Sequence, residues 1–290
     1  MQTVLAPAKV NLYLHVGPPN QAGRHPLDSL VVFAGSEAAD RLTVEPADAV
    51  QLAVIGPQAD ACGDISDNLV FRAADALKKT LGTKAGARLT LVKHLPVAAG
   101  IGGGSADAGA ALRALNKLWG GPDDVDHLIA IAAHLGGDVP ACVISQPVIM
   151  RGEGERLSGV TLPFEIPAIL VNSSIPCPTG SIFKAFDAAE GGTDFAEQAT
   201  PKFGTLDDLL EWLPSTFNDL EPPALTHHPE LAKTLKSLQV LENVECVRMS
   251  GSGGTCFALF KTMDDAHHAG EVLKTENPDW WIAVTKLGGS

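Results

Sequence analysis

The chain has 290 residues, and 45% of them are hydrophobic, so it can bury one large core or two fused ones. It carries 34 acidic against 21 basic residues, and the net charge of -13 would repel a polyanion, which argues against nucleic acid as a partner. Its five cysteines form no C-x-x-C pair, which predicts reduced thiols in a cytoplasmic protein. No apolar run reaches the roughly 18 residues of a membrane helix, and the N-terminus does not have the pattern of a signal peptide.

The first half of the chain alternates between strand and helix patterns. Apolar residues at every second position predict a strand over 9–16. Similar runs predict further strands near 29–34, 41–46, 50–55 and 87–93. After Asp67 the apolar spacing becomes helical, and Gly82 ends that helix. The pattern also predicts helices over 105–118 and 125–135 and short strands around 141–151.

The second half of the chain predicts an order of elements typical of a ferredoxin-like arrangement. A strand after residue 165 precedes helices, and a loop is predicted over 187–205, where two glycines lie among acidic residues. The order continues with strands at 244–248 and 255–260, a helix at 264–274 and a strand at 281–286. Both halves therefore predict the α+β class.

A glycine-rich segment runs from Pro96 to Gly109. Its glycines at 100, 102, 103 and 104 come directly before Ser105, which is a good N-cap for the helix predicted over 105–118. Glycines let the backbone approach a ligand, and a helix N-terminus adds free amides and a positive dipole end. The segment therefore predicts a phosphate-binding loop, with a surface loop that binds nothing as the alternative. It fits neither G-x-x-x-x-G-K-[ST], nor G-x-G-x-x-G, nor G-x-S-x-G.

Two further segments carry polar residues in unusual places. Lys9 and Asn11 interrupt an apolar strand pattern, and a buried lysine needs an anionic partner. The alternative is that Lys9 faces water on an edge strand. The segment 249–256 is a second turn rich in glycine and serine, for which an ordinary connection between two strands is the alternative.

These three segments, in this order, resemble the signature motifs of the GHMP kinases, a superfamily that includes homoserine and mevalonate kinases. The resemblance runs over nearly the whole chain and implies a GHMP kinase fold. That fold has an N-terminal part like domain 2 of ribosomal protein S5 and a ferredoxin-like C-terminal part, with the active site in the cleft between them. Applied here, it implies an ATP-binding domain over 1–160 and a C-terminal domain over 161–290.

Other segments resemble one branch of the superfamily, whose substrate is a cytidine diphosphate-linked methylerythritol. They are Gly23-Arg24-His25, Asp67-Asn68-Leu69-Val70, Gly136-Gly137-Asp138-Val139-Pro140, Arg151-Gly152-Glu153-Gly154, Ile175-Pro176-Cys177-Pro178-Thr179 and Asn218-Asp219-Leu220-Glu221-Pro222. The resemblance implies a cytoplasmic, ATP-dependent enzyme that phosphorylates the 2-hydroxyl of this small molecule in the non-mevalonate isoprenoid pathway. We expect a monomer or a weak homodimer with no membrane or nucleic-acid partner. A homoserine or mevalonate-type kinase is the enzymatic alternative, and a sensor that binds nucleotide without catalysis is the other.

The resemblance also implies roles for single residues. Asp138 is the base that accepts the hydroxyl proton, and Lys9 sits between it and the phosphate. The ATP phosphates lie over the glycine-rich loop, and the positions that bind nucleotide are Asn68, Lys93, Pro96, Gly100, Gly102, Gly103, Gly104 and Ser105. Family kinases use Mg-ATP. The sequence contains no cluster of carboxylates that would bind a metal, and Mg²⁺ is commonly bound through substrate phosphates.

For the substrate, the resemblance places His25 against the cytosine base, Phe183 on its face and Asn11 close to the polyol. An ordinary core position is the alternative for Phe183. The chain departs from the family at three positions: Arg24 stands where tyrosine is usual, and Ala106 and Gly254 replace serines. A guanidinium can also stack on a base, so we expect Arg24 to alter cytosine binding rather than abolish it.

Overall fold

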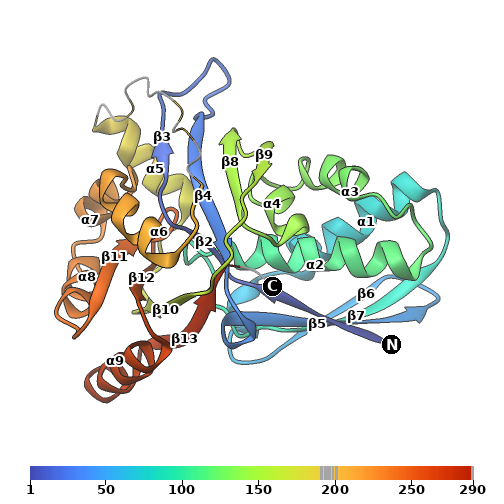
Figure 1. The fold of residues 1–290 in the computed structure, drawn as a ribbon. Helices are drawn as coiled ribbons and strands as arrows, with labels where there is room; N and C mark the ends of the chain where they lie inside the picture. Colours follow the sequence, from blue (N-terminus) through green and yellow to red (C-terminus); the bar gives the residue numbers. More distant parts are fainter. Residues whose placement is uncertain (190–191, 193–196, 198, 200–201, 289–290) are drawn as a thin grey trace. The chain divides into compact units, whose positions relative to one another are not determined.

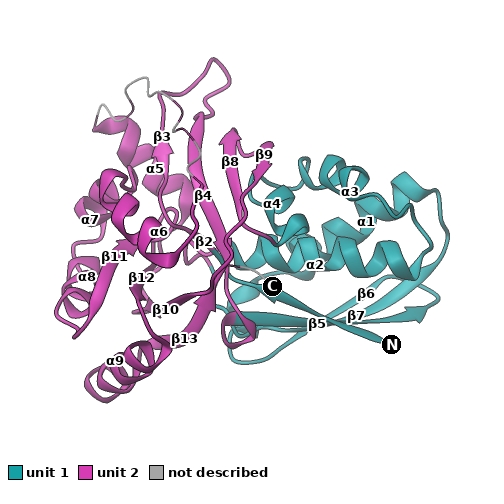
Figure 2. Cartoon of the chain, viewed as in Figure 1, with its two compact units in different colours: residues 1–9, 39–97, 102–145 teal, residues 10–38, 98–101, 146–290 magenta. Residues whose placement is uncertain are grey.

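A computed structural model of the chain describes residues 1–189, 192, 197, 199 and 202–288 (Figure 1). The residues form two compact units, each assembled from separate stretches of the chain (Figure 2). Unit 1 consists of Met1–Lys9, Ala39–Val97 and Gly102–Ser145, and unit 2 consists of Val10–Ala38, Ala98–Ile101 and Gln146–Ser290. The predicted domain boundary between residues 160 and 161 falls inside unit 2 and stays a prediction.

The sheet of unit 1 is mainly antiparallel. Its order is β1 (Gln2–Pro7), β5 (Ala39–Ala47), β7 (Gly86–Val92) and β6 (Gln51–Ile55). Only the β6–β7 pair of this sheet, among the described residues, is parallel, and the helix between these two strands makes the crossover that a parallel pair needs. The strands predicted near 41–46, 50–55 and 87–93 are confirmed.

Helices α1 (Leu69–Leu81), α2 (Gly103–Leu118), α3 (Val125–Ala132) and α4 (Val139–Ile144) belong to unit 1. Helix α1 follows the prediction closely, because its helically spaced apolar residues are buried and Gly82 ends it with a φ of 62°. The strands predicted around 141–151 are wrong in their first part, which is α4. Its apolar run is buried on all sides, and such a short run does not distinguish strand from helix.

Apart from Lys9, which belongs to unit 1, the next sheet lies in unit 2. Its order is β2 (Lys9–Asn11), β4 (Leu27–Phe33), β8 (Val148–Gly152) and β9 (Arg156–Gly159), with β3 (His15–Val16) paired to β4. The single strand predicted over 9–16 is therefore wrong, because it breaks after Asn11. All residues from 8 to 16 are buried, including the polar ones. The reason is that a second segment covers them: Leu14 forms a parallel bridge with Asn218.

The second sheet of unit 2 is antiparallel, in the order β11 (Val244–Met249), β12 (Thr255–Phe260), β10 (Ile166–Asn172) and β13 (Trp281–Leu287). The helices of this unit are α5 (Thr179–Ala188), α6 (Leu206–Trp212), α7 (Glu221–His227), α8 (Leu231–Gln239) and α9 (Met263–Glu276). Short 3-10 turns occur at Ser36–Ala38, Ala59–Cys62, Ile65–Asp67 and Leu213–Ser215. This strand order is the ferredoxin-like one, so that prediction is confirmed. Part of the loop predicted over 187–205 lies outside the described residues.

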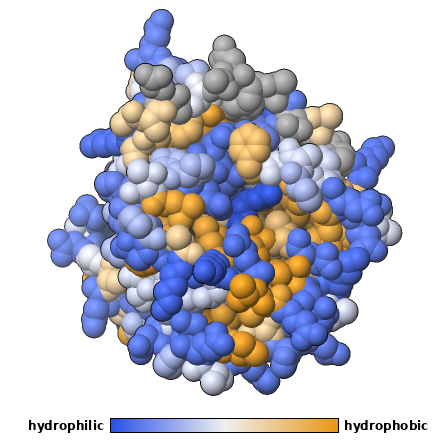
Figure 3. All heavy atoms as spheres, turned by 90° about the vertical axis from the view of Figure 1, so that its left-hand side faces the viewer, coloured by the Kyte–Doolittle hydropathy of each residue, from blue (hydrophilic) through white to orange (hydrophobic). Residues whose placement is uncertain are grey.

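Figure 3 shows one face of the molecule, on which several apolar patches lie among hydrophilic residues. Within the described part of the chain, no helix combines the length and apolar character needed to cross a membrane.

Candidate active site

The glycine-rich segment forms the start of α2. The helix begins at Gly103, so the predicted start at Ser105 is wrong, and Ser105 lies in the first turn rather than at the cap. Gly102 occupies the cap position with a φ of 57°, a left-handed conformation that favours glycine. The two glycines that follow adopt helical angles despite their poor helix propensity. Three successive positions without side chains therefore lie at the amide end of a 16-residue helix.

Lys9 connects this helix start to Asp138. Its side chain is 3% exposed, and its Nζ donates to Asp138 Oδ2 over 3.0 Å. A Cβ on Gly102 would lie 3.2 Å from the Lys9 Cβ, so the lysine stem packs directly against this glycine. Lys9 thus does not face water on an edge strand. The turn, the ammonium and the carboxylate lie together within unit 1.

Asp138 is positioned at the start of α4, in the Gly-Gly-Asp-Val-Pro segment. It occupies the cap position, but its side chain accepts from Lys9 and caps no backbone amide among the described residues. Its exposed fraction is 35%, so one buried and one accessible side chain form the pair. A ligand can therefore reach the carboxylate of Asp138, while the buried Lys9 ammonium keeps this carboxylate in position.

A second lysine lies beneath the helix start. Lys93 is buried and donates to Asp107 over 2.9 Å and also to Asp40. A Cβ on Gly103 would lie 3.1 Å from the Lys93 Nζ. The ammonium predicted to bind nucleotide is thus already paired with two carboxylates, and the sequence did not predict this pairing. Only the position of Asp107, inside the glycine-rich motif, could have indicated it.

Burial and charge shift the pKa values of this group. Burial raises the pKa of Asp107 to about 7, and the nearby Asp40 adds to this, although the Lys93 ammonium opposes it. For Lys93, burial alone would lower the pKa, but the charges of Asp107 and Asp40 outweigh it and raise the pKa above its ordinary value.

The second glycine turn connects β11 and β12 in unit 2. A Cβ on Gly100 would lie 2.4 Å from the Ser250 carbonyl oxygen, and the Ser250 hydroxyl donates to the Gly100 carbonyl over 3.1 Å. The first part of the glycine-rich loop is therefore packed on this turn. Gly254 has a φ of 89°, and a Cβ there would lie 3.1 Å from the Ala99 Cα. This geometry favours glycine at position 254.

The segment 218–222 holds the turn in place. Asn218 Nδ2 donates to the carbonyl oxygens of Met249 and Gly251 over 2.8 and 2.9 Å. The Met249 amide donates to Glu221 Oε2 over 2.8 Å. These contacts give Asn218 and Glu221 a structural function that their sequence pattern alone did not reveal.

Asn11 lies next to the same turn. It is 1% exposed, its backbone amide donates to Ser250 Oγ over 3.2 Å, and its Nδ2 donates to Ser29 Oγ over 2.8 Å. Ser29 and Ser250 were not predicted as site residues, because Ser29 has no motif around it and Ser250 was part of the segment 249–256, in which no single residue was assigned a role.

The proposed base-binding residues lie side by side in unit 2. The ring centroids of His25 and Phe183 are 4.9 Å apart, with a tilt of 40°. His25 Nδ1 is 2.9 Å from the Gly17 carbonyl oxygen, and Nε2 is 3.4 Å from Asp187 Oδ1. A ligand that bonded to Nε2 would therefore compete with Asp187. Phe183 is half-buried and also packs against the core, so both interpretations of this residue fit its position.

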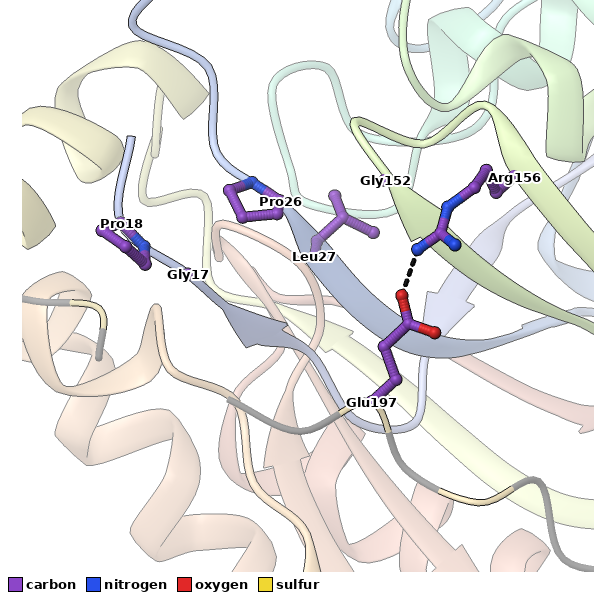
Figure 4. Close-up of a pocket in the computed structure, with 7 residues that line it drawn as sticks. All are labelled: Gly17, Pro18, Pro26, Leu27, Gly152, Arg156 and Glu197. Carbon is purple, nitrogen blue, oxygen red and sulfur yellow. Dashed lines mark hydrogen bonds and ion pairs between the residues drawn. The ribbon is translucent and has the colours of Figure 1, made fainter. Parts of the chain in front are cut away.

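Arg24, which the sequence predicted to alter cytosine binding, forms an ion pair of 2.7 Å with Glu153 and is 71% exposed. Near this segment a cavity of about 130 Å³ is lined by Gly17, Pro18, Pro26, Leu27, Gly152, Arg156 and Glu197 (Figure 4). Figure 4 shows the guanidinium of Arg156 directed at the Glu197 carboxylate.

Asn68 and Pro96, two more residues predicted to bind nucleotide, lie outside α2. Asn68 caps α1, because its Oδ1 accepts from the Val70 amide over 2.9 Å. Pro96 is buried in the segment that leads from β7 into the glycine-rich loop. The other positions, from Gly102 to Ser105, lie at the start of α2.

Comparisons with known proteins agree with these motifs. The family model described as GHMP kinases N terminal domain matches residues 68–146, and the model described as GHMP kinases C terminal matches residues 195–279. The two matches lie on either side of the predicted domain boundary.

Relatives and solved structures narrow the assignment. The chain is 51% identical over 288 residues to the 4-diphosphocytidyl-2-C-methyl-D-erythritol kinase of Hyphomonas neptunium. This match covers 98% of the chain and 96% of the relative. It is 45% identical to the enzyme of that name from Parvibaculum lavamentivorans, with coverage of 99% and 98%. A crystal structure of 4-(cytidine 5'-diphospho)-2C-methyl-D-erythritol kinase matches with a TM-score of 0.78, 34% identity and full coverage of both chains. The chain therefore belongs to the family of 4-diphosphocytidyl-2-C-methyl-D-erythritol kinases, within the GHMP kinases.

Proposed function

We propose that this protein transfers a phosphoryl group from ATP to the 2-hydroxyl of 4-diphosphocytidyl-2-C-methyl-D-erythritol, a step of the non-mevalonate isoprenoid pathway. The observation that carries the proposal is the Lys9–Asp138 pair beside the glycine start of α2. The names of the relatives at 45% and 51% identity support the choice of substrate.

Asp138 is the proposed general base. The substrate hydroxyl oxygen attacks the γ-phosphorus of ATP, a new O–P bond forms, and the bond to the bridging oxygen of ADP breaks. The hydroxyl proton passes to the accessible Asp138 carboxylate, which must lie within hydrogen-bond reach of it. The Lys9 ammonium orients that carboxylate and offsets negative charge on the transferring group.

The amides at the start of α2 are the proposed phosphate site. Gly102, Gly103 and Gly104 carry no side chains, the first N–H groups of α2 have no acceptor within the helix, and the helix dipole favours negative charge there. Asn68, Lys93, Pro96 and Gly100 remain proposed nucleotide positions. For Lys93, the ion pairs with Asp40 and Asp107 support a role in holding the loop rather than direct contact with ATP.

Mg²⁺ is proposed to enter with ATP. Ser105, which is half-buried on the first turn of α2, offers a hydroxyl oxygen of the hard type that this ion prefers, and phosphate oxygens and water would supply the other ligands. When bound, the ion would neutralise charge on the phosphates. In the described residues, no group of three or more His, Cys, Asp or Glu side chains is arranged to hold a metal.

The cytosine base is proposed to lie on Phe183 next to His25, and the polyol is proposed to lie at Asn11. The contact between the His25 and Phe183 rings supports a shared surface for a planar base. Arg24 is held by Glu153, so a stacking role for its guanidinium would require this ion pair to break. We also propose a cytoplasmic location and a monomer or weak homodimer.

The alternative kinase functions have weaker support. A homoserine kinase structure from Cytophaga hutchinsonii matches with a TM-score of 0.68 but only 18% identity, covering 98% of this chain and 94% of that one, which shows the fold alone. A sensor without catalysis would not need an accessible carboxylate paired to a buried lysine.

An assay with purified protein tests the proposal. ADP release is measured with ATP, Mg²⁺ and either the cytidylated methylerythritol, homoserine or mevalonate. We expect turnover with the cytidylated substrate only. Turnover of homoserine or mevalonate without the cytidylated compound would refute the proposed substrate, and the absence of turnover with all three, together with ATP binding, would favour the sensor.

A further inference from the structure

The orientation of the buried Asn11 amide is determined by its neighbours. Asn11 Nδ2 and Ser29 Oγ are 2.8 Å apart, and Ser29 Oγ lies 2.5 Å from the Tyr13 carbonyl oxygen. A carbonyl oxygen can only accept, so the single hydroxyl proton of Ser29 is donated to Tyr13. Toward Asn11, the Ser29 oxygen can then only accept. The NH₂ group of Asn11 must face Ser29, which excludes the flipped amide.

The carbonyl end of the same amide has an unused acceptor. Asn11 Oδ1 is buried and accepts no hydrogen bond from any described residue. A Cβ on Gly251 would lie 3.3 Å from this oxygen, so Oδ1 faces the glycine turn between β11 and β12. Buried polar atoms nearly always have a partner, and one without a partner requires an explanation. A ligand that carries a hydrogen-bond donor would supply the missing partner of Oδ1.

The chemistry of Oδ1 restricts that ligand. An amide oxygen accepts from O–H or N–H groups, and it repels phosphate and carboxylate oxygens. In the cytidylated substrate, the methylerythritol part carries hydroxyl groups, whereas the diphosphate carries only acceptors near neutral pH. The backbone of Asn11 is also fixed, because its amide donates to Ser250 Oγ. The backbone and the NH₂ group of Asn11 are thus both held, while its buried Oδ1 has no donor among the described residues.

We propose that Ser29 is a positioning residue, which holds the Asn11 carbonyl toward a hydroxyl of the methylerythritol part of the substrate. The inference rests on the proposed function and adds a specificity determinant to it. Without the Ser29 hydroxyl, the amide can turn and present its NH₂ group to the ligand. The protein would then lose its preference for a donor at this position.

Calorimetric titration without ATP tests the proposal with two probes, the cytidylated methylerythritol and CDP, which lacks the polyol. In Ser29→Ala we expect about five-fold weaker binding of the full substrate, the effect of one hydrogen bond, and an unchanged affinity for CDP. Ser29→Thr keeps the hydroxyl and should restore the preference. Asn11→Leu removes the acceptor itself and should reproduce the loss. Thr234→Val removes another buried hydroxyl of unit 2, which bonds to Ser173, and should leave the ratio of the two affinities unchanged.

The outcomes separate this inference from the proposed function. Equal losses of affinity for both probes in Ser29→Ala would show a merely structural role, and no loss for either would show that the hydroxyl is dispensable. Either result overturns the inference. A wild-type protein that binds the full substrate more tightly than CDP but does not phosphorylate it would contradict the proposed function, while a selective loss of substrate affinity in Ser29→Ala would still support the role of Ser29.

Discussion

Lys9 and Asp138 are separated by 129 positions in sequence, and their charged groups lie 3.0 Å apart. Their exposed fractions differ sharply, at 3% for Lys9 and 35% for Asp138. Burying a lysine without an anionic partner is costly, so the accessible carboxylate also stabilises the buried ammonium. A substitution of Lys9 and a substitution of Asp138 should therefore have different effects on the protein.

Asp138→Asn should remove the base while keeping the shape of the side chain. We expect turnover of the cytidylated substrate to fall by about 10²- to 10⁴-fold, the usual contribution of general base catalysis, while ATP still binds. Asp126→Asn, at an exposed position in the first turn of α3, is the matched control and should keep full turnover. The rate is measured by ADP release and ATP binding by calorimetry. Undiminished turnover in Asp138→Asn would show that the base is another residue.

The glycines at the start of α2 should respond differently to alanine. Gly102 has a φ of 57°, and an added Cβ would lie 3.2 Å from Lys9, so Gly102→Ala should destabilise unit 1 by about 1–2 kcal/mol. Gly104 is helical, and its Cβ would meet only the Leu69 side chain at 3.7 Å, so Gly104→Ala should stabilise the helix by about 0.5–1 kcal/mol. Urea unfolding of the two variants measures the difference. Equal effects of both substitutions would mean that the conformation of Gly102 is not required.

The buried group of Asp107, Lys93 and Asp40 predicts a pH-dependent stability. Burial raises the pKa of Asp107 in the folded protein to about 7, whereas the ordinary pKa of this side chain is 3.8. Between these values the folded state binds more protons than the unfolded state, so raising the pH through this window lowers the free energy of unfolding. The slope is at most about 1.4 kcal/mol per pH unit.

Asp107→Asn removes this titration. We expect the stability of the variant relative to the wild type to rise from pH 4 to pH 7 and then to level off. Thermal unfolding at several pH values measures it, and titrating groups elsewhere cancel in the difference. Asp75→Asn, which breaks an exposed pair with Lys79, is the control and should follow the wild-type curve. Parallel curves for wild type and Asp107→Asn would contradict the prediction.

The sequence predicted local elements well and long-range contacts poorly. Helix α1 and the ferredoxin-like sheet follow from periodic apolar residues and glycine breaks, which are local signals. The buried partner of Lys93, Asp40, lies 53 positions away in sequence, and the partner of Asn218, Met249, lies 31 positions away. No periodicity encodes such pairs.

Similar reasons explain the errors at the site itself. The start of α2 at Gly103 depends on the left-handed angle of Gly102, which the preference of serine for caps did not reveal. The break after Asn11 depends on residues 217–218 covering the strand. The roles of the site residues come from resemblance to the family and stay proposals, whereas the proximity of Lys9 and Asp138 is a finding of the structure.

Phe183 allows the proposed base site to be tested apart from the core. If cytosine stacks on its ring, the loss of the aromatic face should weaken CDP binding by about 1–3 kcal/mol, or about five- to 150-fold. Phe183→Leu keeps an apolar side chain without that face, and Phe183→Tyr keeps the face. We therefore expect weak CDP binding in Phe183→Leu, near-normal binding in Phe183→Tyr, and unchanged ATP binding in both, as measured by calorimetry. Phe260→Leu provides the core control, because Phe260 is fully buried in the same hydrophobic core and should affect thermal stability more than CDP affinity. If Phe183→Leu lowered stability and left CDP affinity intact, Phe183 would be a core residue, and the cytosine base would have to be recognised elsewhere.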